Sequence, residues 1–150
     1  MGSTFQLFEK AEQLEIVCAS IYKALAQKFQ ADPEAHDLFQ RLEAEEQQHA
    51  ARIRLLSARY QHDSKLLEAA AVAAHHLDEL VAEARAVLAQ IAAGAWGASL
   101  EVVKGELADL EERFSAAHAH LIAATANPGL RAFFEQLAQQ DQAHGELLRG

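Results

Sequence analysis

Two stretches of the chain place a histidine three residues after a carboxylate. Glu46 and His49 form this step in "EAEEQQHAAR", and Asp141 and His144 form it in "LAQQDQAHGE". In an α-helix, residues i and i+3 project from the same face, so each step directs a carboxylate and an imidazole the same way. Hard carboxylate oxygens combined with an imidazole nitrogen suit iron or manganese. Each stretch is therefore a candidate half of a metal site.

Both steps lie at the same place in an internal repeat. Residues 31–49 read "ADPEAHDLFQRLEAEEQQH" and residues 126–144 read "ANPGLRAFFEQLAQQDQAH", with six identities in nineteen positions and no gap. Each copy opens with a helix break, where Asp32 or Asn127 can cap a helix that starts at the following proline. The repeat predicts two equivalent halves of one bundle and disfavours the alternative that Glu46 is an ordinary surface residue.

A carboxylate-bridged di-metal bundle also needs one glutamate from each of two further helices. Glu15 in "AEQLEIVCASIY" adjoins an apolar seam and can fill the first of these positions. Aligning the Leu-Glu pairs places Glu111 of "LADLEERFSAAH" on Glu15, with Glu106 as the alternative ligand. The same alignment places His118 on Tyr22. For Tyr22 we expect core packing with a satisfied hydroxyl, and a position behind the ligands is an alternative. For His118 a role as a ligand or behind the ligands stays open.

The elements that must position these residues are helical. Apolar residues recur at spacings of three and four, which is typical of amphipathic helices. The pattern predicts four such helices, over residues 5–29, 33–60, 99–125 and 128–150. Residues 64–93 are alanine-rich and predict one long helix or two shorter ones, followed by the linker "AAGAWGAS". We therefore expect an all-α four-helix bundle that forms a single domain over residues 1–150. Residues 60–98 would form a long, helix-containing crossover between the second and third bundle helices.

Composition excludes several classes of function. The net charge is −9 and no stripe of Lys or Arg is present, which argues against binding to nucleic acid or to an anionic membrane surface. The one cysteine, Cys18, rules out an intrachain disulfide or a cysteine-based metal cluster. The chain has no apolar run of the roughly 20 residues that a membrane span needs, and no secretory signal is recognisable at its start. We expect a cytoplasmic protein.

Four carboxylates in a bundle core would repel one another and would be costly to desolvate. Two divalent metal ions would neutralise their formal charge. Without metal, we expect protons to take that place, through raised pKa values of the carboxyl groups.

The segments "LEIVCASIY", "EEQQHA", "LEERFSAAH" and "DQAHGE" together resemble the rubrerythrin branch of the ferritin-like di-iron superfamily. The resemblance covers residues 5–58 and 99–147 and implies a ferritin-like bundle holding two iron ions, or a mixed iron and manganese pair. The ligands that it implies are Glu15, Glu46, His49, Glu111, Asp141 and His144. Asp141 departs from the glutamate of the family pattern and is one methylene shorter. We also expect the short form of the family, without a rubredoxin-like domain.

The resemblance implies an oxidoreductase that couples Fe(II) oxidation to the reduction of peroxide or dioxygen. Such an enzyme needs no catalytic residue beyond the metal ligands and draws on an electron donor of unknown identity. We also expect a homodimer, because helical bundles of this size with apolar outer residues often dimerise. Two alternatives stay open. One is a protein that sequesters iron without significant turnover, and the other is a metal-free dimerising bundle.

Overall fold

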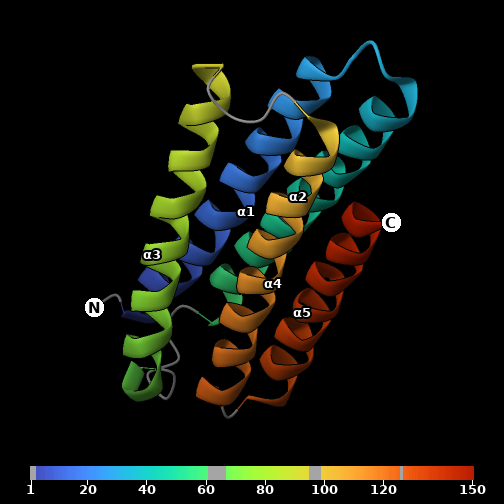
Figure 1. Ribbon diagram of the computed structural model, residues 1–150. Helices are drawn as coiled ribbons and strands as arrows, with labels where there is room; N and C mark the ends of the chain where they lie inside the picture. Colours follow the sequence, from blue (N-terminus) through green and yellow to red (C-terminus); the bar gives the residue numbers. More distant parts are fainter. Residues whose placement is uncertain (1–2, 61–66, 95–98, 126) are drawn as a thin grey trace.

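A computed structural model describes residues 3–60, 67–94, 99–125 and 127–150 of the chain. Five helices and no strand are present in these ranges (Figure 1). They are α1 (Ser3–Lys28), α2 (Pro33–Tyr60), α3 (Leu67–Ala92), α4 (Leu100–Ala124) and α5 (Pro128–Arg149). The all-α bundle predicted from the sequence is confirmed. Among the described residues, no helix combines the length and the apolar character that crossing a membrane would require.

The two Pro-containing breaks start their helices in the same way. Asp32 Oδ1 accepts a hydrogen bond of 3.1 Å from the backbone N–H of Ala35 at the start of α2. Asn127 Oδ1 accepts from the backbone N–H groups of Gly129 and Leu130, at 2.9 and 3.1 Å, at the start of α5. Each side chain satisfies N–H groups that have no partner within the helix. The repeat therefore reflects two equivalent starts for the helices that carry the carboxylate–histidine steps.

The helices form two pairs and one covering helix. α1 packs against α2, and α4 packs against α5, while α3 lies against α1 and α4 (Figure 1). α3 is thus the helical part of the crossover between the second and third bundle helices, and it forms one long helix. Lys10 pairs with Asp78 at 2.6 Å, and Arg113 pairs with Glu83 at 2.7 Å, so α3 has an ion pair to each neighbour. The ends of the expected crossover, 61–66 and 95–98, lie outside the described residues.

The predicted apolar seams form the core. The core side chains with at most 1% of their surface exposed include Leu14, Leu25, Leu42, Ile53, Leu107, Leu121 and Leu130. Cys18 is buried among them as a free thiol. Removing this apolar surface from water is the main force that holds the helices together, at roughly 25 cal/mol per Å². Acidic and imidazole side chains interrupt the core in its middle, and they form the candidate site.

Candidate metal centre

Seven acidic or imidazole side chains are buried together between the bundle helices. None of them is more than 3% exposed: Glu15, Glu46, His49, Glu111, His118, Asp141 and His144. Side chains of this kind are rarely buried completely unless they are paired or bind a metal ion. The concentration of such groups in an otherwise apolar core therefore requires a specific explanation.

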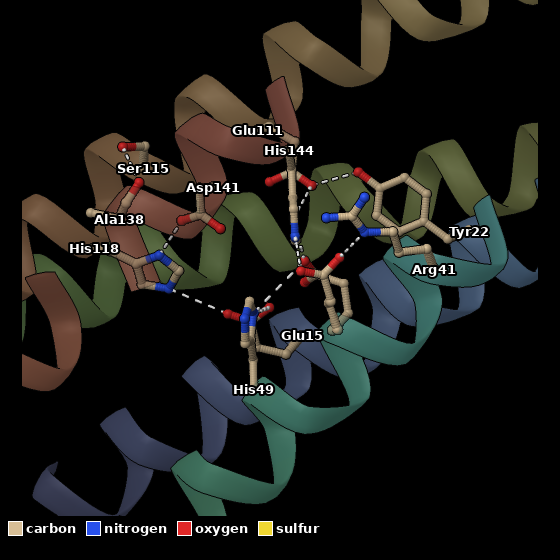
Figure 2. A network of polar contacts seen from close by, with 12 residues as sticks. Glu15, Tyr22, Arg41, His49, Glu111, Ser115, His118, Ala138, Asp141 and His144 are labelled. Carbon is tan, nitrogen blue, oxygen red and sulfur yellow. Dashed lines mark hydrogen bonds and ion pairs between the residues drawn. The ribbon is translucent and has the colours of Figure 1, made fainter. Parts of the chain in front are cut away.

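All four bundle helices contribute to this cluster (Figure 2). α1 provides Glu15, and α4 provides Glu111 and His118. The i, i+3 steps of α2 and α5 direct their two side chains inward together, as the helical period requires. The structure thus brings together all six residues that the resemblance implied as ligands. Glu106, the alternative on α4, is exposed and lies outside the cluster, because it sits on the face of α4 that points to solvent.

Potential ligand atoms fall into two groups, each with its atoms within 4.8 Å of one another: Glu46, Glu111, Asp141 and His144 in one, and Glu15, Glu46 and His49 in the other. In the first group, His144 Nδ1 lies 3.0 Å from Glu46 Oε1 and 3.5 Å from Glu111 Oε1. In the second, His49 Nδ1 lies 3.8 Å from both Glu15 Oε2 and Glu46 Oε1. Glu46 belongs to both groups, so its carboxylate would help to hold an ion in either of them.

Most of these atoms have no hydrogen-bond partner in the part of the chain that the structure describes. The unpartnered atoms include Glu15 Oε1, both oxygens of Glu46, His49 Nδ1, Glu111 Oε2, Asp141 Oδ1 and both nitrogens of His144. A buried polar atom without a partner costs about 1–3 kcal/mol, and more when it is charged. Divalent metal ions coordinated by these oxygens and nitrogens would satisfy them. The donor set therefore fits a pair of oxygen- and nitrogen-bound transition metals.

The carboxylates differ in their affinity for protons. Burial, and then the negative charge of Glu15, raise the pKa of Glu46 well above its ordinary value. Burial also raises the pKa of Asp141 to about 7, although the charge of His118 opposes it. Burial alone would raise the pKa of Glu15 too, but the adjacent side chains of Glu46 and His49 and the charge of His118 outweigh it and lower that pKa to about 2. The expected rise therefore holds for Glu46 and Asp141 and is wrong for Glu15, which stays ionised because its neighbours favour the charged form.

Two further side chains contact candidate ligands (Figure 2). The Tyr22 hydroxyl donates a hydrogen bond of 2.5 Å to Glu111 Oε1. His118 Nδ1 lies 2.5 Å from Asp141 Oδ2, a hydrogen-bond distance. Both residues therefore lie against carboxylates of the cluster, which is the alternative that the sequence left open for them.

One contact of the site was not foreseen from the sequence. Glu45, partly exposed on α2, has its Oε1 3.7 Å from His144 Nε2. It also accepts a hydrogen bond of 3.3 Å from Arg41. Within the acidic run "EAEE", only the helical phase distinguishes Glu45 from its buried neighbour Glu46, and that phase alone does not show how close α5 approaches.

A buried carboxylate and imidazole cluster between four helices, with a long crossover, defines the ferritin-like class of di-metal carboxylate bundles. The Rubrerythrin family model matches residues 6–150. The chain belongs to the rubrerythrin family, which confirms the resemblance predicted from the sequence. No curated protein and no solved structure matches it in the same comparisons.

Proposed function

We propose that this protein is a di-iron, or mixed iron and manganese, oxidoreductase that couples Fe(II) oxidation to the reduction of peroxide or dioxygen. The observation that carries the proposal is the set of buried oxygen and nitrogen atoms that lack hydrogen-bond partners in the middle of the bundle. Six residues would hold the metal ions: Glu15, Glu46, His49, Glu111, Asp141 and His144. Membership of the rubrerythrin family supports the choice of iron and of an oxidant as substrates.

The bound metal pair would supply the one-electron steps between Fe(II) and Fe(III) that the amino-acid side chains cannot provide. The protein's own part is to bind and orient the metals. Glu46 has both oxygens free and is common to the two ligand groups. Tyr22 fixes one oxygen of Glu111 and leaves the other free. The surrounding apolar core excludes bulk water, which strengthens every charge interaction in the site.

A second candidate function is iron sequestration without significant turnover. The observation in its favour is the contact between Asp141 Oδ2 and His118, which occupies one oxygen of the shortened ligand. A carboxylate with one free oxygen has less freedom to change its binding mode during a redox cycle. The two candidates bind the same metal and differ only in catalysis.

Steady-state consumption of hydrogen peroxide or dioxygen by the iron-loaded protein, with a chemical reductant in excess, separates the two. An oxidoreductase consumes many equivalents of oxidant per protein chain, whereas a sequestering protein stops after its bound iron is oxidised. The matched control is His75→Ala, an exposed histidine on α3 that should leave turnover unchanged. A protein that holds two irons and consumes oxidant only once contradicts the oxidoreductase proposal.

If the protein is instead a metal-free dimerising bundle, added Fe(II) or Mn(II) should leave its melting temperature unchanged. A ligand that binds only the folded state raises that temperature by mass action. An unchanged melting temperature under anaerobic conditions would favour the structural bundle.

The homodimer, the cytoplasmic location and the need for an electron donor of unknown identity stay predictions.

A further inference from the structure

His118 is completely buried and contacts two of the six proposed ligands, although it is not one of them (Figure 2). Its Nδ1 lies 2.5 Å from Asp141 Oδ2 on α5, and its Nε2 lies 3.5 Å from Glu15 Oε1 on α1. The imidazole therefore lies between carboxylates that come from two different helices.

The internal symmetry of the chain gives His118 a counterpart in Tyr22. Tyr22 reaches from α1 to Glu111 on α4, and His118 reaches from α4 to Glu15 on α1. The tyrosine contact is a hydrogen bond, because the hydroxyl donates its one hydrogen to the carboxylate. The histidine contact is not, since both His118 Nε2 and Glu15 Oε1 lack a hydrogen-bond partner. The two halves of the site thus differ in chemistry at this one position.

Asp141 explains how His118 is oriented. One carboxylate oxygen, Oδ2, accepts from Nδ1–H of the imidazole, while Oδ1 has no partner. A neutral imidazole that donates from Nδ1 to a carboxylate presents the lone pair of Nε2 on its other side. This is the arrangement in which metal-bound histidines are held, with a carboxylate fixing the tautomer and the ring.

His118 Nε2 borders the second group through Glu15, although His118 is not itself among the residues whose ligand atoms lie within 4.8 Å of one another. Glu15 and His49 are members of that group, which has three residues, whereas the group around His144 has four. Metal–nitrogen and metal–oxygen bonds are about 2 Å long, so two ligand atoms 3.5 Å apart can share one metal ion. His118 would supply the fourth residue.

We propose that His118 is a seventh metal ligand, which binds through Nε2 beside Glu15, while Asp141 orients it through Oδ2 and binds the neighbouring metal through Oδ1. Asp141 stands where the other half of the chain has the longer Glu46, and His118 stands where it has Tyr22. These two differences between the halves then serve the same purpose. This inference rests on the proposed function, because it assigns a further ligand to the same metal pair.

An anaerobic titration with Co(II), followed by its visible absorption, tests the assignment without reference to activity. The wild-type protein is expected to bind two Co(II) ions. In His118→Gln, one ion should bind with unchanged affinity and the other at least tenfold more weakly. The matched control is His120→Gln, an exposed histidine on the same helix, which should bind both ions like the wild type.

The proton NMR spectrum of the Co(II)-loaded protein adds a structural readout. Each ligating imidazole with a protected N–H gives a strongly shifted, exchangeable signal, and His118→Gln should lose one such signal relative to the His120→Gln control. His118→Tyr is the second variant, because it introduces the residue type that Tyr22 provides at the equivalent position of the other half. It should lose the same ion and the same signal.

The possible failures are distinct. Two Co(II) ions bound with wild-type affinity by His118→Gln or His118→Tyr, with the full number of shifted signals, would overturn the role of His118 and leave the proposed function intact. No Co(II) bound by the wild-type protein would overturn the proposed function itself.

Discussion

The Tyr22 hydroxyl on α1 donates a hydrogen bond of 2.5 Å to Glu111 Oε1 on α4, and this contact joins the two halves of the bundle. The tyrosine is 2% exposed, and its ring stacks on Phe39 at a centroid distance of 6.3 Å. Burial and the charge of Glu111 raise the pKa of Tyr22 well above its ordinary value, so the hydroxyl keeps its proton. It therefore serves as a fixed donor to the carboxylate.

Replacing Tyr22 by Phe should lower the free energy of unfolding of the metal-free protein by about 1–3 kcal/mol. The ring packing is retained, but Glu111 Oε1 loses its hydrogen bond while it stays buried, and that desolvation is then uncompensated. Urea unfolding followed by circular dichroism measures the change. Tyr60→Phe, at a half-buried position away from the cluster, is the control and should change the stability by less than about 0.5 kcal/mol. Equal effects of the two substitutions would contradict the role given to Tyr22.

Much of the fold could be predicted from the sequence because it depends on local signals. The proline breaks after Asp32 and before Gly129 mark helix starts that the structure retains. Ser99 is the N-cap residue of α4, but its side chain makes no capping hydrogen bond. The packing of α3 against both α1 and α4 was not predictable, because it depends on contacts between distant segments and on two ion pairs at the surface.

The candidate site was predictable where helical phase determines it. The steps at Glu46 and Asp141 and the Leu-Glu pairs point inward by periodicity alone. The Leu-Glu alignment favoured Glu111 and kept Glu106 as the alternative, and the structure distinguishes them because only Glu111 is buried. The sequence also could not predict that one carboxylate oxygen of Asp141 contacts His118 while the other stays free. This arrangement depends on how closely α4 and α5 approach each other.

Glu46→Gln should stabilise the metal-free protein and weaken its metal site. Glu46 is completely buried with both oxygens unpartnered, and its pKa is raised. At pH 8 it must therefore either carry a negative charge in a crowded cluster or take up a proton that the unfolded chain does not hold. A neutral amide removes that repulsion, so the free energy of unfolding at pH 8 should rise by about 1–2 kcal/mol, a common gain when a functional charge is removed. Chemical denaturation of the metal-free variant measures the gain. The control is Glu45→Gln at the partly exposed neighbour, which should change the free energy of unfolding far less. A Glu46→Gln variant that is less stable than the wild type would refute the account of charge crowding.

The stability of the metal-free protein should fall as the pH rises from 6 to 9. The pKa of Glu46 is raised, that of Asp141 is raised to about 7, and the charge of Asp141 raises that of His118 to about 9 although burial opposes it. Each group binds its proton more tightly in the folded than in the unfolded chain, so its stabilising effect is present at low pH and is lost as the pH passes its folded pKa. Glu15 has a lowered pKa of about 2 and affects stability only at acid pH.

Bound metal should reverse this trend, because metal ligands must be deprotonated and binding therefore strengthens with pH. Melting temperatures from pH 6 to 9, measured anaerobically with EDTA or with Mn(II), give both curves. The gap between them should widen toward pH 9. A metal-free melting temperature that rises over this range would contradict the protonation states assigned to the cluster.

The central claim is that the buried cluster is a two-metal site, and metal stoichiometry tests it most directly. Anaerobic loading with Fe(II), followed by desalting and metal analysis, should leave two irons per chain in the wild type. The His49→Ala, His144→Ala double variant removes one imidazole from each ligand group. It should retain no stoichiometric iron. Two irons retained by the double variant, or none retained by a folded wild type, would contradict the assignment of the cluster as a di-metal centre.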